Sequence, residues 1–252
     1  MRIPSKLWAL LLLAVAGACA GAPSRDLTVS AAASLTEAFT ELAKHYEEKH
    51  PETRVHLNFG ASGSLVQQII RGAPVDVFAS ADQETMGRAQ SEGLVLADTR
   101  HDFAVNSLVV IVPTDSKSTP TTLRDLEQAS IQRIAMGSPA TVPAGRYAQQ
   151  AMQEGGVWSA LSTKVIHTQN VRQALDYVAR GEVDAAFVYT TDVKARRESV
   201  NLAFAVPLST AIRYPIAPIS GAKQPEEAAR FVSFVRSEQG QAIMRRYGFL
   251  SP

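Results

Sequence analysis

Short β-branched or apolar runs alternate with segments of helical period along most of this 252-residue chain. Residues 27–31 alternate in polarity and stop at small residues, which is typical of a β-strand. Apolar residues then repeat at helical spacing from Leu35 to Tyr46, and Pro51 ends the segment. A helix is therefore predicted from 34 to about 49.

The same alternation continues towards the C-terminus. Further strands are predicted at 54–59, 75–80, 107–113, 133–136, 164–166, 185–189, 202–206 and 214–219. Helices are predicted at 64–71, 83–92, 123–129, 144–153 and 171–180, with a closing helix at 225–247. Strands and helices in alternation predict βαβ units around a mainly parallel sheet, and so an α/β fold.

Four of the predicted helix starts carry small or hydroxyl residues directly after a strand. They lie at 31–36 (AAASLT), 60–65 (GASGSL), 142–147 (VPAGRY) and 168–172 (TQNVR). A helix start offers unpaired backbone N–H groups and the positive end of the helix dipole, which together suit an anion. Ligands of open α/β sheets bind beyond the carboxyl ends of the strands, so two facing lobes would bring these starts to one cleft. The pattern predicts a cradle for a small oxyanion.

The first twenty residues differ from the rest of the chain. Two positive charges precede an apolar run at 7–15, and small residues follow, which is typical of a secretory signal peptide at 1–20. Two interpretations stay open: cleavage near Gly21 releases a periplasmic protein, or 16–19 (AGAC) acts as a lipoprotein box that anchors Cys19. We favour release. Because Cys19 is the only cysteine, no internal disulfide is expected in the mature chain.

Composition and charge exclude several classes of protein. A hydrophobic fraction of 46% and a charged fraction of 19% are typical of a globular domain. The signal segment holds two of the 25 basic residues and none of the 24 acidic ones, so the mature chain carries about −1 and is not expected to bind nucleic acid. The five histidines show no metal-ligand spacing. The segment 60–63 lacks the second glycine of a nucleophile elbow, because Ser64 stands there, so no enzyme is expected.

Several motifs, taken together, resemble periplasmic molybdate-binding proteins of ABC transporters, a family of type II solute-binding proteins. The segments that carry the resemblance are 29–36 (VSAAASLT), 72–82 (GAPVDVFASAD), 106–113 (NSLVVIVP), 142–148 (VPAGRYA), 186–189 (AFVY) and 246–249 (RYGF). The likeness runs from about 27 to 250. DVFASAD is shared more broadly among extracellular solute-binding proteins, whereas AAASLT, VPAGRYA and VY at these separations are more specific.

The resemblance implies a two-lobed flytrap fold in which each lobe is a mainly parallel sheet flanked by helices. We expect one lobe at 27–105 plus 216–252 and the other at 106–215. The resemblance also implies capture of molybdate, and of tungstate, for delivery to an inner-membrane ABC permease with its ATPase. The protein is then a monomer without a cofactor, and it contacts the metal only through the oxygens of the ion. The alternative ligand is sulfate or another tetrahedral oxyanion.

Carried over residue by residue, the resemblance implies five ligands of the oxyanion. Ser34 and Ser62 would give hydroxyl and backbone N–H groups, Ala144 and Val171 would give backbone N–H groups, and Tyr189 would give its phenol. Ser64 stays an alternative to Ser62, because similar proteins carry a run of serines at this place.

Three charged residues near these ligands are interpreted as structural. Arg146 lies two residues past Ala144 and is expected to be a solvated helix residue. Asp76 and Asp82 flank the third predicted strand. A carboxylate that pointed into an anion site would repel the ligand, so both are expected to cap or bridge locally.

Overall fold

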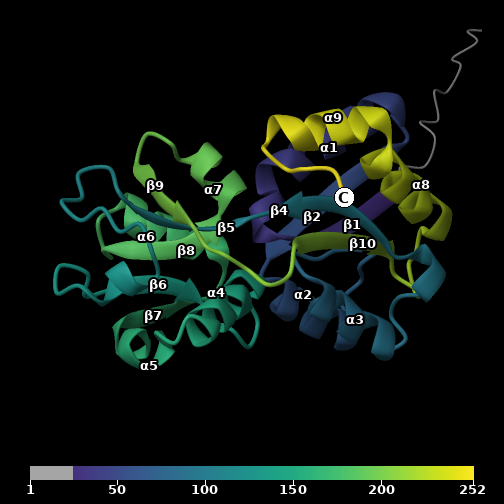
Figure 1. Cartoon of the computed structure of the whole chain (residues 1–252). Coiled ribbons are helices and arrows are strands. Elements are labelled where there is room, and N and C mark those ends of the chain that lie inside the picture. The colour runs from purple at the N-terminus through teal and green to yellow at the C-terminus, as the bar shows by residue number, and fades with distance from the viewer. Residues whose placement is uncertain (1–24) are drawn as a thin grey trace, which may run out of the picture.

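The computed structural model describes residues 25–252 and contains two five-stranded sheets, each flanked by helices. Figure 1 shows the sheets side by side as two lobes, with the N-terminal elements and the C-terminal helices in the same lobe. The predicted signal peptide at 1–20, including Cys19, lies outside the described residues. Within 25–252, no helix combines the length and the apolar character that a bilayer span requires.

The first lobe has the strand order β2-β1-β3-β10-β4. Its strands are β1 (Arg25–Ala32), β2 (Thr53–Gly60), β3 (Val77–Ala79), β4 (His101–Asn106) and β10 (Ile212–Pro218). β1 pairs in parallel with β2 and β3, while β10 runs antiparallel to β3 and β4. In this register Val29 lies opposite both Leu57 and Val77, so apolar residues of three strands line up across the sheet.

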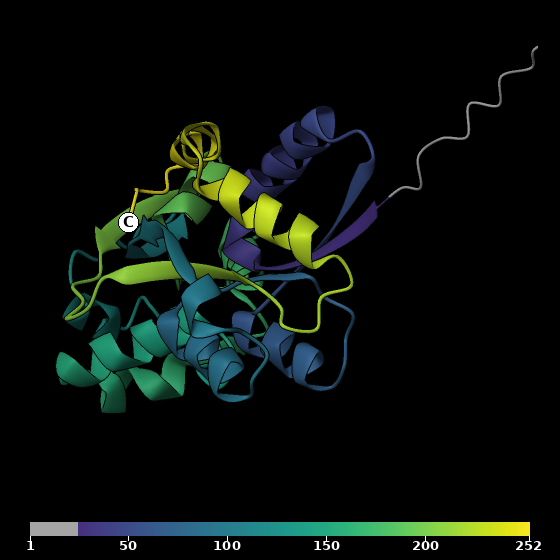
Figure 2. The same ribbon diagram turned by 90° about the vertical axis from the view of Figure 1, so that its right-hand side faces the viewer.

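Helices cover both faces of this sheet. They are α1 (Thr36–Lys49), α2 (Ser62–Ile70), α3 (Gln83–Ser91), α8 (Pro225–Arg236) and α9 (Glu238–Arg246). Figures 1 and 2 show α1, α8 and α9 on one side of the sheet and α2 and α3 on the other. Phe39 of α1 packs edge-on against Phe103 of β4 and Phe231 of α8, which fixes α1 between the sheet and the C-terminal helices.

The second lobe has the strand order β7-β6-β8-β5-β9. Its strands are β5 (Leu108–Pro113), β6 (Ile134–Gly137), β7 (Val165–Thr168), β8 (Ala185–Tyr189) and β9 (Val200–Ala205). Its helices are α4 (Pro143–Glu154), α5 (Trp158–Leu161), α6 (Val171–Ala179) and α7 (Thr190–Ala195). β6 is parallel to β7 and β8, and β5 is antiparallel to β8 and β9. Each sheet therefore has a single strand that opposes the others, as the prediction of mainly parallel sheets requires.

The chain crosses between the sheets twice. Only Ser107 separates β4 of the first sheet from β5 of the second, and residues 206–211 lead from β9 back to β10. The boundary predicted between 215 and 216 falls inside β10, and all of 212–218 belongs to the first sheet. The first part of β10 pairs with β4 and the last part with β3, across an irregularity between Tyr214 and Pro215. Sequence pattern places the strand but not the sheet it joins.

Some predicted elements differ in the structure. The closing helix is broken at Ser237, whose hydroxyl accepts from the Gly240 N–H at 3.2 Å and so begins α9. The helix predicted at 123–129 is a 3-10 turn at Arg124–Glu127. β4 was not predicted, because His101 and Asp102 give it no apolar alternation at its start, and the six residues of α7 are too few to show a helical period.

Two glycines let α4 begin directly against the end of β6. A Cβ on Gly145 would lie 1.8 Å from the Gly137 carbonyl oxygen, and a Cβ on Gly137 would lie 2.3 Å from the Val142 Cγ1 atom. A side chain at Gly145 would require the backbone of β6 to move, and one at Gly137 would require the Val142 side chain to move. The start of α4 is therefore held close to the edge of the sheet where β6 ends.

We expect Gly145→Ala to lower the free energy of unfolding by about 1–3 kcal/mol, because the added methyl group overpacks against the backbone of β6. For a chain of this size, that loss lowers Tm by about 2–4 °C for each kcal/mol, which differential scanning calorimetry can measure. Gly221→Ala is the matched control, because a Cβ there meets nothing within 4 Å. Equal Tm values for the two variants would contradict the close approach of α4 and β6.

Candidate functional site

The carboxyl ends of β1, β2, β6 and β7 each lead into a helix, and the starts of these helices meet between the lobes. They enclose a small cavity with an empty volume of about 210 Å³ including its mouth. We call it the donor cavity. It is lined by the uncharged residues Ala32, Ala33, Ser34, Gly60, Ala61, Ser62, Ala81, Val142, Pro143, Ala144, Asn170, Val171 and Tyr189.

All five predicted ligand residues therefore line one cavity, and each is buried. Ser34, Ser62, Ala144 and Val171 stand at the four helix starts, whereas Tyr189 ends β8. Two of the starts come from each lobe. Ser64 is half-buried, about half a turn further along α2, and is not part of the lining, so the structure brings Ser62 rather than Ser64 to this cavity.

The Ser62 hydroxyl is oriented by the backbone. Its Oγ atom accepts a hydrogen bond from the Ala81 N–H at 3.0 Å. A backbone N–H can only donate, so the hydrogen of the Ser62 hydroxyl is left for another acceptor. Since Ser62 is fully buried in the lining of the donor cavity, that hydrogen is available to a ligand there.

The Tyr189 hydroxyl is buried and has no hydrogen-bond partner among residues 25–252. A buried polar group without a partner costs on the order of 1–3 kcal/mol, so such groups call for an explanation. Burial raises the pKa of Tyr189 well above its ordinary value, and the phenol therefore keeps its proton. The site holds a neutral donor at the wall of the cavity that nothing else in the described chain uses.

Backbone N–H groups of α4 and α6 supply further donors. Ala144 and Val171 lie in the first turns of these helices, where N–H groups have no acceptor inside the helix. Pro143 stands at the first position of α4, where its missing N–H removes no helical bond. The Asn170 side chain caps α6 by accepting from the Gln173 N–H at 3.0 Å, which leaves the N–H of Val171 unused by this cap.

The two arginines next to these donors bond to carboxylates, not to the cavity. Arg146 was predicted to be solvated, and this is wrong: its Nη2 atom lies 2.5 Å from Asp82 Oδ2 and 2.7 Å from Thr85 Oγ1. Sequence spacing cannot show that Asp82, in the other lobe, is the partner. Asp82 also accepts from the Thr85 N–H at the start of α3, as the interpretation of a local cap requires.

Arg172 forms a second ion pair with a carboxylate of the other lobe. Its guanidinium donates to both carboxylate oxygens of Glu37 in α1, with one N–O distance of 2.9 Å. Its Nε atom lies 3.0 Å from Asp192 Oδ1, although neither atom forms an aligned hydrogen bond. Arg172 belongs to the second lobe and Glu37 to the first, so this pair also joins the lobes.

The lobes are closed over the donor cavity. Besides the two arginine pairs, the Gly63 N–H of α2 donates to the Thr141 carbonyl of the second lobe at 2.9 Å. A Cβ on Gly63 would lie only 2.6 Å from that carbonyl oxygen. These contacts join the two lobes at residues adjacent in sequence to the lining of the cavity, in agreement with its burial.

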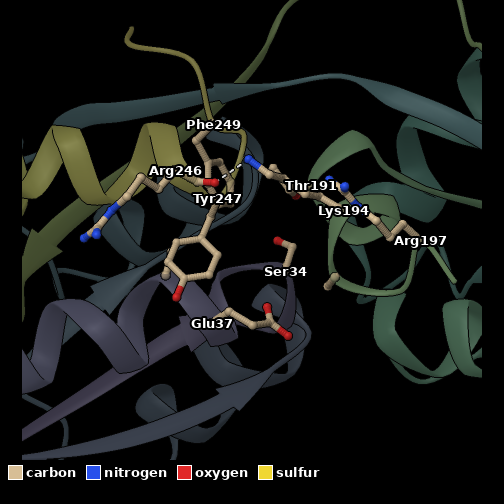
Figure 3. Close-up of a pocket in the computed structure, with 10 residues that line it drawn as sticks. Ser34, Glu37, Thr191, Lys194, Arg197, Arg246, Tyr247 and Phe249 are labelled. Carbon is tan, nitrogen blue, oxygen red and sulfur yellow. Dashed lines mark hydrogen bonds between the residues drawn. The ribbon is translucent and has the colours of Figure 1, made fainter.

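A larger cavity, which the sequence did not predict, lies on the far side of Ser34, between α7 and α9. Its empty volume is about 620 Å³ including its mouth, and it contains Lys194, Arg197 and Arg246. Figure 3 shows Lys194 reaching the Arg246 carbonyl, while the Arg246 guanidinium points away from Ser34. That guanidinium pairs with Glu41. Two of the three cations thus have protein partners, so the larger cavity does not offer an array of unused donors.

The described residues contain no group of three or more His, Cys, Asp or Glu side chains placed to hold a metal ion. The chemistry that the donor cavity does offer is hydrogen-bond donation from neutral groups at several helix starts. Such a donor set matches a small anion that has an acceptor on every side.

The carboxyl group of Asp192 is buried behind Tyr189 and accepts from the Tyr189 N–H at 2.9 Å. Its pKa is raised to about 6, because burial disfavours the charged carboxylate more than Arg172 favours it. The folded chain therefore holds this proton more tightly than the unfolded chain, in which the group titrates near 3.8. The stability contributed by the protonated form is lost as the pH rises from about 4 to about 6.

We expect the unfolding free energy of the wild type, relative to Asp192→Asn, to increase by roughly 2–3 kcal/mol between neutral pH and about pH 4. Asparagine keeps an acceptor for the Tyr189 N–H but does not titrate. Urea unfolding of both proteins across this range measures the difference. A difference that stays constant with pH would contradict the raised pKa.

Comparison with known proteins agrees with this geometry. The chain is 36% identical over 251 residues to the molybdate-binding protein ModA of Escherichia coli, covering 96% of this chain and 95% of that protein. It is 30% identical over 253 residues to ModA of Haemophilus influenzae, covering 99% of each. The solved periplasmic molybdate-binding protein of Azotobacter vinelandii superposes with a TM-score of 0.80 at 22% identity, over 90% of this chain and 99% of that one.

The superposition with the Azotobacter protein shows a shared fold, and the two five-stranded sheets of this chain confirm the two-lobed architecture predicted from sequence. A family model described as bacterial extracellular solute-binding protein matches residues 27–250, which is nearly the whole described chain. The closed lobes, the enclosed donor cavity and this match lead to the same assignment: the chain belongs to the bacterial extracellular solute-binding protein family.

Proposed function

We propose that this protein captures molybdate, and also tungstate, outside the cytoplasm and delivers it to an ABC permease and its ATPase. The observation that carries the proposal is the donor cavity, in which uncharged donors from four helix starts converge and the Tyr189 hydroxyl has no protein partner among residues 25–252. The relatives named as molybdate-binding proteins supply the identity of the ion. The cavity by itself supports a small oxyanion.

The proposed ligands are the Ser34, Ser62 and Tyr189 hydroxyls and backbone N–H groups at Ala144 and Val171. Each hydrogen bond to a charged group contributes about 1.5–3 kcal/mol net. Several of them, acting with the helix dipoles, hold a dianion without a cation after desolvation and ordering costs are subtracted. Donors on helix starts and strand ends do not collapse around a smaller ion, so a cavity of this kind favours molybdate and tungstate over sulfate.

We infer binding, not catalysis, from the same residues. The Ser62 Oγ atom accepts from a backbone N–H, and no lining residue of the donor cavity is a histidine, a carboxylate or a lysine that could act as a general base. A serine without a base is a hydrogen-bond donor, not a nucleophile. No cofactor is part of the proposal.

We also propose a cellular location and an oligomeric state for the mature protein. An extracellular family and a signal-like segment at 1–20 support export, with release into the periplasm as a monomer. Lipid attachment at Cys19 is the alternative, and mass spectrometry of the mature N-terminus distinguishes the two. Sulfate, or another tetrahedral oxyanion, is the alternative ligand.

Thermal melts of the mature protein with molybdate, tungstate, sulfate and phosphate test the ligand. A ligand at one hundred times its Kd stabilises the folded state by about 2.7 kcal/mol. We expect a higher Tm with molybdate and tungstate only. A rise with sulfate would change the proposed ligand from molybdate to sulfate but would still support the donor cavity as an oxyanion site. No rise with any of the four anions would contradict the proposal.

We expect Ser34→Ala to weaken molybdate binding by about 1.5–3 kcal/mol, because one donor to a charged acceptor is lost. Isothermal titration calorimetry measures the change. Ser64→Ala is the matched control on the GASGSL segment, and it should bind as the wild type does. Equal losses in the two variants would contradict the assignment of the site.

Gly63→Ala tests whether closure is part of binding. The added methyl group would lie 2.6 Å from the Thr141 carbonyl oxygen only when the lobes are closed. We therefore expect molybdate affinity to fall about tenfold or more, while the Tm of the ligand-free protein stays close to that of the wild type. Small-angle scattering should then show less compaction on addition of molybdate. Unchanged affinity would exclude a closed bound state of the kind described here.

A further inference from the structure

Behind the donor cavity, a short chain of side-chain hydrogen bonds leads to Ser34. It starts at Asn106, the last residue of β4, and passes through Tyr214 of β10. The Tyr214 hydroxyl lies 3.3 Å from the Asn106 Nδ2 atom and 3.0 Å from the Ser34 Oγ atom. All three residues are buried. The distances alone leave open which hydroxyl donates to which.

The orientation of the Asn106 amide fixes the direction at one end. Its Oδ1 atom accepts from the Ser107 N–H at 2.9 Å, and a backbone N–H can only donate. The amide nitrogen therefore faces the other side, where it donates to Thr191 Oγ1 at 2.9 Å and to the Tyr214 oxygen. An amide nitrogen never accepts, so Tyr214 must be the acceptor in this contact.

Tyr214 then has one hydrogen left to donate. Burial raises the pKa of Tyr214 far above the ordinary value for a phenol, so this hydrogen is always present. Among residues 25–252, the side-chain partners of its hydroxyl are Asn106 and Ser34, and Asn106 cannot accept through its nitrogen. The hydrogen consequently goes to the Ser34 Oγ atom.

Ser34 is thereby made an acceptor towards the protein, and its own hydrogen is left for the cavity. We propose that Asn106 and Tyr214 are positioning residues that direct the Ser34 hydroxyl to donate to the bound ion, and so favour an oxyanion whose facing oxygen carries no proton. The inference rests on the proposed function, since it concerns the same cavity. Ser62 is oriented in the same sense by the Ala81 N–H, which no side-chain substitution can reverse.

The consequence is selection by protonation state, in addition to selection by size. A fully ionised oxyanion offers an acceptor to the Ser34 hydrogen. A monoprotonated ion that turned its O–H group towards Ser34 would leave the Ser34 hydrogen without an acceptor in a buried site, which is unfavourable. The orientation of the Asn106 amide therefore determines, through the hydroxyls of Tyr214 and Ser34, which group faces the ligand.

Asn106→Asp reverses this direction. A carboxylate only accepts, so Tyr214 would donate to it, and Ser34 would have to donate to the Tyr214 oxygen. A lone pair of Ser34 would then face the ion, and we expect molybdate affinity to fall about tenfold or more. The added negative charge also weakens binding, so this variant alone does not test the proposal.

Tyr214→Phe, made in both backgrounds, separates the two effects. In the wild-type background it removes the group that directs Ser34, and affinity should fall severalfold. In the Asn106→Asp background it frees Ser34 to donate again, and affinity should rise, while the added charge is the same in both members of the comparison. Titration calorimetry of the four proteins with molybdate, at one mildly alkaline pH, measures the cycle.

A change of sign between the two backgrounds supports the proposal. A loss in both backgrounds, or no effect in either, overturns it and leaves Asn106 and Tyr214 as structural residues. Absence of molybdate binding by the wild type is a different result and overturns the proposed function instead.

A second measurement covers a failure of the aspartate variants to fold. The ratio of molybdate affinity to hydrogen phosphate affinity should fall severalfold in Tyr214→Phe, because Ser34 can then accept from a protonated ion. Tyr247→Phe is the matched control: Tyr247 lines the same larger cavity as Ser34, but its hydroxyl bonds to Glu41 at 2.8 Å, whereas Ser34 bonds to Tyr214. An unchanged ratio in Tyr214→Phe would overturn the proposal.

Discussion

The structure depends on one constraint: the first N–H groups of a helix have no acceptor inside that helix, and here four such sets are buried in one place. A buried N–H without a partner is costly. The Gly63 and Gln173 N–H groups have acceptors within the chain, whereas an anion bound in the donor cavity would serve those at Ala144 and Val171. The parallel strands β1, β2, β6 and β7 bring the starts together, since they all end at the same edge of their sheets. Gly137 and Gly145 allow one of these starts to approach its strand closely.

The described residues that line the donor cavity are all uncharged, and the two arginines beside it form ion pairs with carboxylates. Arg146 and Arg172 stand within two residues of proposed backbone donors, yet each is matched to a carboxylate of the opposite lobe, Asp82 or Glu37. Their charges join the lobes and do not add to the field on the ligand. An ion held by neutral donors is bound through hydrogen bonds and not through a nearby cation. The direction and length of each hydrogen bond then determine which ion the cavity prefers.

Much of this could be predicted from the chain alone, because period-2 and helical patterns are local. All strands except β4, most helices and the small residues at the helix starts were predicted in this way. The partner of Arg146, the sheet joined by β10 and the break at Ser237 were not, because each depends on contacts between distant segments. Tyr214 gave no signal either: an aromatic residue in an apolar strand is ordinary core, and its role is visible only through its bonds to Ser34 and Asn106.

The connection between β4 and β5 has a mechanical consequence. Ser107 is the only residue between these two strands, and its N–H is tied to the Asn106 side chain. So short a link restricts sliding between the lobes, and we expect their relative motion to be mainly a rotation about the crossovers at 107 and 206–211. Asn106 stands directly beside this crossover, so a rotation of the lobes about it would displace the Asn106 side chain little.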